Sequence, residues 1–316
     1  MHSLLTIILA AGKGTRMKSA IPKVLHPIAG LPMLGHVLLA SEAAGTGALA
    51  VVVGPEMENV AAHAREVVQR ASVFIQTEQL GTANAVLAAR DALAAHNGDV
   101  LVTYGDTPLL RPETLKALQL ALEEGADVAV LGFEAADPTG YGRLLMDGPD
   151  LLAIREEREA TPEERQIRLC NSGVMAFRSP DIVGVLDRIG NANRKGEFYL
   201  TDAIEVIRKD GLQARVVTCP ESEVMGVNSR DQLAQAEAVW QTRRRLTAMR
   251  DGASLIAPET VWFSHDTVVG KDVTIEPNVF IGPGVIIEDN VVIKANTHLQ
   301  GIDEKSRGGI RIRSGA

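Results

Sequence analysis

Aliphatic side chains recur every six residues near the C-terminal end of this sequence. The positions that carry them are Val269, Ile275, Ile281, Ile287, Ile293 and Leu299. Neither an α-helix nor an isolated β-strand has a period of six, whereas a parallel β-helix forms one short face from each hexapeptide. The sequence therefore predicts a hexapeptide β-helix with these side chains stacked inside it.

A second series with the same period accompanies the first. Its members are Asp272, Asn278, Gly284, Asn290 and Asn296. Asn, Asp and Gly favour turns because they tolerate a left-handed backbone. The period ends after Leu299, since Lys305 and Arg311 occupy the next two positions. We therefore expect about two coils over residues 258–303, fewer than the three or so repeats that are usually stable alone, and a tail over 304–316.

The first 228 residues alternate strand-like apolar runs with helix-like segments. Four of the predicted strands are Leu4–Leu9, Ala48–Val53, Val100–Thr103 and Val128–Leu131. This alternation is typical of an α/β fold with a largely parallel sheet. Shorter runs near 144–146, 151–155 and 174–177 lack helical crossovers between them. We therefore expect a Rossmann-like domain with a mixed sheet over residues 1–228.

A long helix is predicted between the two parts of the chain. The segment 229–250 has an apolar stripe at helical spacing, so residues 229–257 are expected to form a helical arm. Its middle carries Arg243, Arg244 and Arg245 in succession. A charge run of this kind usually faces solvent, and we predict that these three arginines do so.

Composition excludes several classes of protein. The chain has 316 residues, 46% of them hydrophobic and 3% aromatic, and a net charge of −8. An acidic balance argues against general nucleic-acid binding. The sequence contains no apolar run long enough to span a membrane, so no stable membrane insertion is expected. Its two cysteines, Cys170 and Cys219, cannot form a disulfide framework, and we expect a cytoplasmic protein.

The charges are unevenly distributed along this acidic chain. Residues 1–41 contain no Asp or Glu, yet Lys13, Arg16, Lys18 and Lys23 all lie there. A chance fluctuation on a solvated surface would give the same count. Because a glycine-rich segment lies in the same region, we favour a confined site for an anion.

Two short motifs carry candidate chemistry. The segment Leu9–Met17 (LAAGKGTRM) follows the first strand, and its glycines allow backbone N–H groups to approach a phosphate. It matches neither the Walker loop nor the dinucleotide fingerprint, so alone it is weak evidence. Gly105 and Asp106 end another strand. An Asp there can cap a turn, which is the commoner role, or hold Mg²⁺ beside a bound phosphate.

Eight segments, taken in order, give the chain a specific resemblance. They are Leu9–Met17, Pro22–Leu25, Gln76–Thr82, Tyr104–Asp106, Pro138–Arg143, Asn171–Gly173, Gly196–Asp202 and Gly226–Asn228. Over about residues 4–300 the chain resembles the N-terminal part of the bacterial bifunctional N-acetylglucosamine-1-phosphate uridyltransferase/glucosamine-1-phosphate acetyltransferases. The wider sugar-nucleotidyltransferase family shares only the first loop and the Gly-Asp motif.

The resemblance implies a nucleotide site and a metal site. Nucleotide binding is implied for Leu9, Ala10, Ala11, Gly12, Gly14, Gln76, Gly81 and Thr82. Among these, the backbone of residues 9–12 with Gln76 and Gly81 would hold uracil. Arg16 and Lys23 would neutralise the triphosphate, and Asp106 and Asn228 would be the protein ligands of Mg²⁺. Arg16, Lys23 and Asp106 are accordingly the candidate catalytic residues.

The resemblance also implies a site for the sugar. Its residues are Tyr104, Gly105, Gly142, Glu156, Asn171, Ser172, Tyr199 and Thr201. Glu156 is the hardest to place from the sequence, because Glu157 follows it and Glu159 lies close by. Ser172 stands where the family commonly has Thr, which keeps the hydroxyl group.

By this resemblance, the reaction would be Mg²⁺-dependent uridyl transfer from UTP to N-acetylglucosamine 1-phosphate, in the supply of precursors for peptidoglycan and lipopolysaccharide. The β-helix would be left-handed. The full-length family forms homotrimers through a long β-helix. With the short β-helix of this chain, we expect a monomer or weak oligomer and no acetyltransferase activity.

Three other functions share part of this sequence pattern. A related enzyme that activates another sugar, such as a glucose-1-phosphate nucleotidyltransferase, also carries the first loop and a hexapeptide tail. A non-catalytic regulator that binds nucleotide sugars would not need Lys23, Asp106 and Asn228. A hexapeptide acyltransferase would need later coils. Pyrophosphate release from UTP with each candidate sugar phosphate distinguishes the first two from a uridyltransferase.

Overall fold

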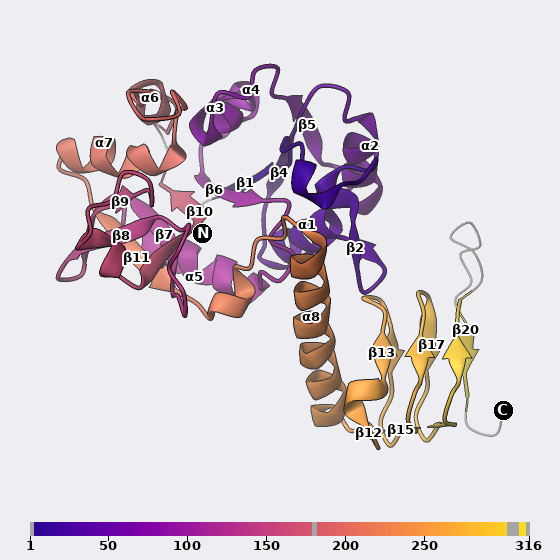
Figure 1. Cartoon of the computed structure of the whole chain (residues 1–316). Helices are drawn as coiled ribbons and strands as arrows, with labels where there is room; N and C mark the ends of the chain where they lie inside the picture. Colours follow the sequence, from indigo (N-terminus) through magenta and orange to yellow (C-terminus); the bar gives the residue numbers. More distant parts are fainter. Residues whose placement is uncertain (1–2, 179–181, 302–309, 314–316) are drawn as a thin grey trace. The chain divides into compact units, whose positions relative to one another are not determined.

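The computed structural model describes residues 3–178, 182–301 and 310–313 (Figure 1). The chain folds into two compact units. The first comprises Met1–Leu25 and Met33–Asn228, and the second comprises His26–Pro32 and Ser229–Ala316. Residues 26–32, which the sequence analysis placed in the first domain, thus group with the C-terminal part. No helix in the described ranges is long and apolar enough to cross a membrane.

The first unit is built on a nine-stranded sheet. In spatial order its strands are β5 (Ser72–Ile75), β4 (Ala48–Val53), β1 (Leu4–Leu9), β6 (Asp99–Tyr104), β10 (Leu169–Phe177), β7 (Val128–Glu134), β11 (Ala214–Thr218), β9 (Asp150–Arg155) and β8 (Arg143–Asp147). The first four are mutually parallel, whereas β10 runs antiparallel to β6 and β7. The prediction of a mixed sheet is confirmed.

Helices cover both faces of this sheet. They are α1 (Met33–Ala43), α2 (Glu58–Val67), α3 (Thr82–Leu87), α4 (Arg90–Ala94), α5 (Pro112–Glu123), α6 (Ile182–Asp187) and α7 (Ala203–Lys209), with short 3-10 turns η1 (Thr15–Met17), η2 (Lys23–Leu25), η3 (Glu164–Gln166), η4 (Leu200–Asp202) and η5 (Glu221–Glu223). Strand β1 is buried throughout. Its Leu5 and Ile7 pack in the cluster that contains α3, α4, α6 and α7, and Ile8 packs against α1 and α2.

The carboxyl ends of three parallel strands meet at one edge of the sheet. Leu9 at the end of β1 is paired with Tyr104 at the end of β6, and the Gly105 N–H donates to the Leu9 carbonyl at 3.0 Å. The Gln76 N–H donates to the Val53 carbonyl at the end of β4 at 2.8 Å. The loops that follow these strands therefore lie together, where open α/β sheets bind ligands.

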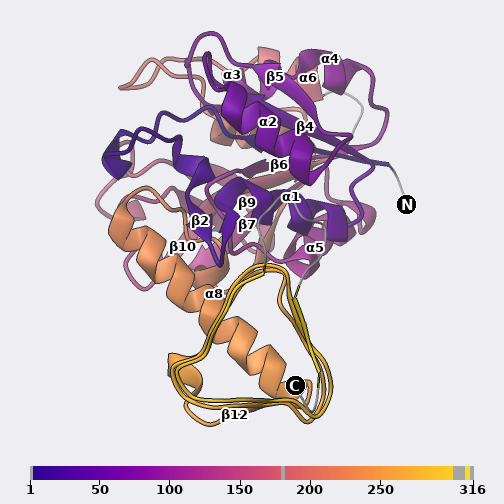
Figure 2. The same cartoon turned by 90° about the vertical axis from the view of Figure 1, so that its right-hand side faces the viewer.

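The second unit contains helix α8 (Arg230–Arg250), the hairpin β2 (Pro27–Ile28) and β3 (Leu31–Pro32), the turn η6 (Pro258–Thr260) and a β-helix. The β-helix has three parallel sheets, seen end-on in Figure 2. They are β12 (Ser254–Leu255), β15 (Thr274–Ile275) and β18 (Val292–Ile293); β13 (Trp262–Phe263), β16 (Phe280–Ile281) and β19 (His298–Leu299); and β14 (Val268–Val269), β17 (Val285–Ile287) and β20 (Ile310–Ile312).

The interior of the β-helix follows the six-residue period. Ile275, Ile281 and Ile287 are buried in a single cluster with the Val residues of the same register. The predicted turn positions Asp272, Asn278, Gly284, Asn290 and Asn296 all have a left-handed backbone, with φ between 55° and 73°. Both predictions from the hexapeptide pattern are confirmed, and the fold class is an α/β domain followed by a short hexapeptide β-helix.

The predicted end of the β-helix was wrong. Strand β20 pairs with β17, so that Ile312 lies beside Ile287. Partners in neighbouring coils are 18 residues apart at Val269 and Ile287, but 25 apart at Ile287 and Ile312. Seven extra residues therefore shift the register before β20, which hid it from a strict period of six. Lys305 lies outside the described residues, and Arg311 pairs with Glu288 at 2.9 Å instead of pointing inward.

The arginines of α8 do not all face solvent, contrary to the prediction. The guanidinium of Arg244 lies 5.1 Å from the Phe263 ring centre, and its Nη2 donates to the Thr267 carbonyl at 2.8 Å. Arg245 lies 5.6 Å from the ring centre of Trp262. Because a guanidinium stacks favourably on an aromatic face, these side chains join α8 to the β-helix.

Candidate active site

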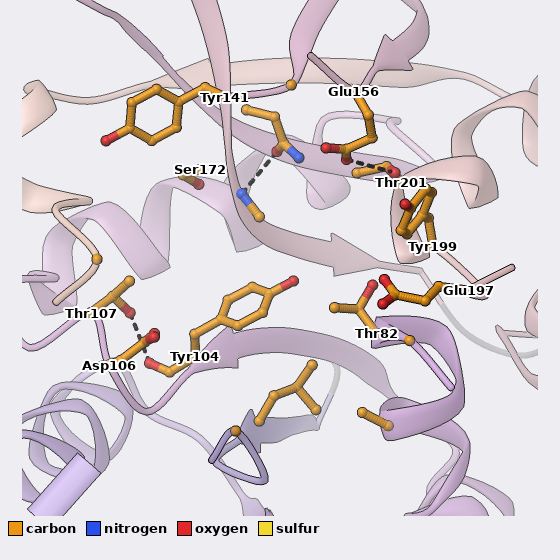
Figure 3. A pocket seen from close by; sticks show the side chains of 18 of the residues that line it. Thr82, Tyr104, Asp106, Thr107, Tyr141, Glu156, Ser172, Glu197, Tyr199 and Thr201 are labelled. Atoms are coloured by element: carbon orange, nitrogen blue, oxygen red, sulfur yellow. Dashed lines mark hydrogen bonds between the residues drawn. The ribbon is translucent and has the colours of Figure 1, made fainter. Parts of the chain in front are cut away.

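A pocket of about 910 Å³ lies in the first unit, above the carboxyl ends of β1 and β6. This volume is large for a small-molecule site. Seventeen of the twenty residues predicted for the site line it: Leu9, Ala10, Ala11, Gly12, Arg16, Lys23, Gln76, Gly81, Thr82, Tyr104, Asp106, Gly142, Glu156, Asn171, Ser172, Tyr199 and Thr201. Gly14, Gly105 and Asn228 lie outside the lining. Figure 3 shows the labelled side chains from both the β6 side and the β10 side of the pocket.

Three polar side chains from distant parts of the sequence converge at the end of β6. The Lys23 ammonium contacts Asp106 Oδ2 and donates to Asn228 Oδ1 at 2.8 Å. Lys23 is 9% exposed, so this charge is largely removed from solvent. A backbone hydrogen bond of 2.9 Å from the Val227 N–H to the Asp106 carbonyl fixes the neighbour of Asn228 on the same loop.

Two glycines that do not line the pocket shape this cluster. Gly14 has φ +59°, and a Cβ there would lie 2.4 Å from Lys23 Cβ. The position therefore needs glycine both for its backbone and for the close approach of Lys23. A Cβ on buried Gly105 would lie 3.3 Å from Ala10 and from Val24. The absence of a side chain at Gly105 therefore allows Ala10 and Val24 to pack closely beside the pocket.

The loops after β1 and β5 form one side of the pocket. Gln76 uses its amide nitrogen within the protein, donating to Asn84 Oδ1 at 2.8 Å and to the Gly81 carbonyl at 3.3 Å. Gln79 donates to the Ala11 carbonyl at 2.6 Å. Arg16 lines the pocket, whereas Lys13 and Lys18 are exposed outside its lining, so the basic N-terminal segment divides into pocket and surface cations.

The three neighbouring glutamates have different partners. Glu156 Oε1 accepts a hydrogen bond from the Thr201 hydroxyl at 3.2 Å (Figure 3), and burial raises the pKa of Glu156 above its ordinary value. Glu157 pairs with Arg143, and Glu159 lies 3.8 Å from Arg194. All three line the pocket, but only Glu156 has a polar partner among the predicted sugar residues.

Strand β10 contributes Asn171 and Ser172 at an irregularity in its pairing with β7. Asn171 Oδ1 accepts from the Gly173 N–H at 2.9 Å, which orients the amide. The Ser172 hydroxyl donates to the Leu131 carbonyl at 2.7 Å and accepts from the Val174 N–H at 3.2 Å. The Ser172 hydroxyl is thus engaged with the backbone, and it supports the bend of the strand.

Tyr104 lies between the two sides of the pocket. Its ring packs on Gly173, where a Cβ would lie 2.7 Å from Tyr104 Cε2. Burial, followed by the charges of Asp106 and Glu156, raises the pKa of the Tyr104 hydroxyl. The hydroxyl therefore stays protonated near neutral pH and can donate a hydrogen bond to a ligand.

Two hydrogen bonds donated by backbone N–H groups join the loop at 79–82 to the segment 195–201. The Phe198 N–H donates to the Leu80 carbonyl at 2.7 Å, and the Leu200 N–H donates to the Thr82 hydroxyl at 2.8 Å. Gly81 has φ +121°, and a Cβ there would lie 2.5 Å from the Phe198 carbonyl oxygen. Residues predicted for the nucleotide and for the sugar are thereby held in one connected structure.

Fourteen lining residues were not among the predicted site residues. They are Val24, Gln79, Ala85, Thr107, Gly140, Tyr141, Glu157, Arg158, Glu159, Gly173, Lys195, Glu197, Val224 and Gly226. Seven of them lie inside the eight motif segments, and extending each segment by one or two positions would have added Thr107, Lys195 and Val224. Glu157, Arg158 and Glu159 lie far from every motif segment, and no sequence pattern distinguished them.

The pocket has a donor set for a hard cation. Within the described residues, no group of three or more His, Cys, Asp or Glu side chains could hold a metal ion. The carboxylate of Asp106 and the amide oxygen of Asn228 nevertheless face one point, because both contact the same Lys23 ammonium. Two protein oxygens suit Mg²⁺ where phosphate oxygens and water complete its shell.

Comparison with known proteins gives two family matches and close relatives. Residues 6–168 match the MobA-like NTP transferase domain, and residues 266–301 match the bacterial transferase hexapeptide (six repeats). The bifunctional protein GlmU of Azorhizobium caulinodans is 60% identical over 300 residues, which cover 95% of this chain and 67% of the relative. That of Xanthobacter autotrophicus is 59% identical with the same coverage, and that of a Bradyrhizobium species is 55% identical over 276 residues.

These matches confirm the resemblance that the eight motif segments indicated. The chain spans about two thirds of the length of the first two relatives, at 67% of each. The first match covers the strands and loops that form the pocket up to β9, and the second covers the β-helix. The chain belongs to the family of the bifunctional protein GlmU, and it is a nucleotidyltransferase.

Proposed function

We propose that the chain transfers a uridyl group from UTP to N-acetylglucosamine 1-phosphate, giving UDP-N-acetylglucosamine and pyrophosphate. The observation that carries the proposal is the convergence of Lys23 and Asp106, which line one pocket of the first unit, with Asn228, which contacts Lys23 from just outside the lining. Anionic substrates need positive charge at the reacting phosphates and polar groups that read the base and the sugar. The pocket has both kinds of group at separate places.

The loops after β1 and β5 are the proposed nucleotide half. The amide nitrogen of Gln76 is engaged by Asn84 and Gly81. Its oxygen Oε1 is then the atom available to accept a hydrogen bond from the N3–H of uracil. Backbone groups of residues 10–12 and the guanidinium of Arg16 also line this side, and they are suited to the ribose and the phosphates.

The segments around Glu156, Asn171 and Thr201 are the proposed acceptor half. Asn171 Oδ1 is held by the Gly173 N–H, which leaves its Nδ2 group to donate to the sugar. Glu156 accepts from Thr201 and can accept a second hydrogen bond from a sugar hydroxyl. Donors and acceptors in these positions suit the hydroxyls and acetamido group of N-acetylglucosamine.

The proposed reaction is an in-line displacement at phosphorus. A phosphate oxygen of the sugar phosphate forms a bond to the α-phosphorus of UTP, and the bond from that phosphorus to the pyrophosphate oxygen breaks. The attacking oxygen is already an anion, so no general base is required. The main obstacle is repulsion between two polyanions, which Lys23 and Arg16 reduce, and the two halves of the pocket align the reactants.

Asp106 and Asn228 are the residues that would hold Mg²⁺, because their oxygens already face a single cationic group. The bound ion would supply further charge neutralisation at the phosphates. Lys23 contacts both of these oxygens, and its ammonium would then compensate charge on the phosphates beside the ion.

The test is pyrophosphate release by the 316-residue chain, with UTP and a panel of sugar 1-phosphates, in Mg²⁺ and in EDTA. We expect turnover with N-acetylglucosamine 1-phosphate at least about tenfold above that with glucose 1-phosphate, since a missing hydrogen-bonding group in a polar site is strongly rejected. We also expect EDTA to abolish turnover. Higher turnover with glucose 1-phosphate would assign a glucose-1-phosphate nucleotidyltransferase. Tight binding of the nucleotide sugar without any turnover would assign a binding protein.

We further propose a cytoplasmic setting, with soluble sugar phosphates as partners and a product used in peptidoglycan and lipopolysaccharide synthesis. The polypeptide of 316 residues is expected to have no acetyltransferase activity. A thiol-release assay with acetyl-coenzyme A and glucosamine 1-phosphate tests this on the same sample. Release of coenzyme A that depends on the amino sugar would contradict it.

A further inference from the structure

Among the described residues, Arg143 has the largest fully buried side chain, and the proposed reaction gives it no part. Arg143 is 1% exposed and begins strand β8. It directly follows Gly140, Tyr141 and Gly142, which line the pocket, but it does not line the pocket itself. Any effect of Arg143 on a bound substrate must therefore act through its neighbours.

The guanidinium of Arg143 joins two separate segments of the chain. Nη1 donates to the Tyr141 carbonyl, in the loop at 138–142. Nη2 lies 2.7 Å from Glu157 Oε2 and donates to the Arg165 carbonyl at 3.3 Å, both in the segment 156–168. A planar guanidinium offers several donors in a fixed fork, so one side chain holds both segments at once.

Both segments lead directly to the residues of the proposed acceptor half. The Gly142 carbonyl, next to Tyr141, accepts a hydrogen bond from the Asn171 N–H at 2.8 Å. Glu156 precedes Glu157 and receives the hydroxyl hydrogen bond of Thr201. Fixing Tyr141 and Glu157 to one guanidinium thus fixes the backbone beside Asn171 and Glu156.

A role in packing alone does not account for this arginine. A buried charge carries a desolvation cost that an apolar side chain of similar volume would avoid. Within the described residues, Arg143 Nε is also buried without a hydrogen-bond partner, which adds to that cost. The arginine is therefore explained by the three contacts of its Nη atoms rather than by the space it fills.

We propose that Arg143 is a positioning residue that sets affinity for the acceptor sugar phosphate by holding the loop at 138–142 against the segment 156–168. This inference rests on the proposed assignment of that side of the pocket to the acceptor. Residues of the nucleotide half, such as Gln76, have no contact with the Arg143 guanidinium among those described.

The first test is Arg143→Lys, which keeps the charge but loses the fork. We expect the KM for N-acetylglucosamine 1-phosphate to rise about tenfold while the KM for UTP stays within about twofold, because only the acceptor half loses its alignment. Arg188→Lys is the matched control, since Arg188 pairs with Asp210 at the surface and does not line the pocket. An unchanged acceptor KM, or equal changes in both KM values, would overturn the proposal.

Glu157→Gln keeps the proposal testable if Arg143→Lys does not fold. Glu157 is partly exposed at 29% of its side chain, and the variant leaves both carbonyl contacts of Arg143 in place. We expect a rise of about threefold in the acceptor KM, again with the KM for UTP unchanged. No change in the acceptor KM of this folded variant would contradict the role of the ion pair.

Hydrogen exchange provides a readout that does not depend on turnover. In Arg143→Lys, the amides of 138–142 and of 156–168 should exchange faster together, at least about threefold, while those of 76–82 keep their rates. If the wild-type enzyme prefers a sugar phosphate other than N-acetylglucosamine 1-phosphate, the proposed substrate is wrong. The KM values of the variants are then measured with the preferred sugar phosphate. Unchanged exchange in both segments would refute the positioning role whatever the substrate is.

Discussion

The pocket and the β-helix are built from the sequence in opposite ways. In the β-helix, side chains 18 residues apart lie beside one another, as at Thr274 and Val292, and the same register repeats from coil to coil. In the pocket, Lys23 meets Asp106 and Asn228, which are 83 and 205 residues away. A periodic structure gives equivalent positions equivalent roles, whereas in the pocket each position is unique.

This difference makes a clear prediction about substitutions. Substitutions at adjacent pocket positions should change turnover by very different amounts. Truncations of interior side chains in the β-helix should all lower its stability by similar amounts.

The largest effect is expected at Asp106. Asp106→Ala should lower turnover at least about a hundredfold, because it removes the carboxylate proposed to hold Mg²⁺ and thereby the ion that neutralises charge at the reacting phosphates. Asp106→Ala also leaves the largely buried Lys23 ammonium without its carboxylate partner, so some loss of stability is expected, and turnover is measured at a temperature at which the variant is folded. Asp210→Ala is the control, as Asp210 pairs with Arg188 at the surface. A folded Asp106→Ala protein with normal Mg²⁺-dependent turnover would remove Asp106 from the site.

The interior of the β-helix should respond uniformly to truncation. Ile281→Ala and Ile287→Ala should each destabilise the second unit by about 2–5 kcal/mol, because both side chains are 0–1% exposed in the same cluster. Val292→Ala should cost less than about 0.5 kcal/mol, since Val292 is 53% exposed on the outer surface. Denaturant unfolding of the three variants measures this. Markedly different losses at Ile281 and Ile287 would break the equivalence of the coils.

A substitution at Gly14 tests whether turnover depends on one close contact beside the pocket. Gly14→Ala should lower turnover about tenfold, since its Cβ would lie 2.4 Å from Lys23 Cβ and the lysine must move. Gly125→Ala is the control, because Gly125 also has a positive φ, of 110°, does not line the pocket, and would have no heavy atom within 4 Å of its Cβ. Comparable losses at both positions would mean that backbone strain, and not the displacement of Lys23, causes the effect.

The sequence predicted the repeated structure well because a period can be read without knowing the fold. The left-handed backbone at Asn278, Asn290 and the three related positions follows from the pattern alone. The insertion before β20 could not be predicted, because seven extra residues end the period locally while the strand pairs normally.

For the pocket, motif order identified residues but not their contacts. Ser172 lines the pocket, yet its hydroxyl is engaged by the Leu131 carbonyl. Glu156, Glu157 and Glu159 could be told apart only by their partners, Thr201, Arg143 and Arg194. Such pairings depend on how distant strands are placed, which local spacing does not encode.

The smallest expected effect is a pH-dependent change in stability caused by a half-buried carboxyl group. The first unit contains such groups, whereas the interior of the β-helix is apolar. Burial, followed by the charge of Glu205, raises the pKa of Asp202 from 3.8 to about 6 in the folded protein. The folded state therefore binds more protons than the unfolded state between about pH 4 and pH 6, so stability falls as the pH rises through this window.

Asp202→Asn should remove this pH dependence. At pH 7 the variant should be more stable than the wild type by an amount on the order of 1 kcal/mol, because one pKa unit corresponds to about 1.4 kcal/mol and the half-buried group is partly screened. Below about pH 4 the two proteins should be equally stable. Asp210→Asn is the control of opposite sign, since the hydrogen bond from Arg188 lowers the pKa of Asp210. Denaturant unfolding at a series of pH values measures the stability of each variant relative to the wild type. If the wild type instead gains stability relative to Asp202→Asn between pH 4 and pH 6, Asp202 is stabilised in its charged form.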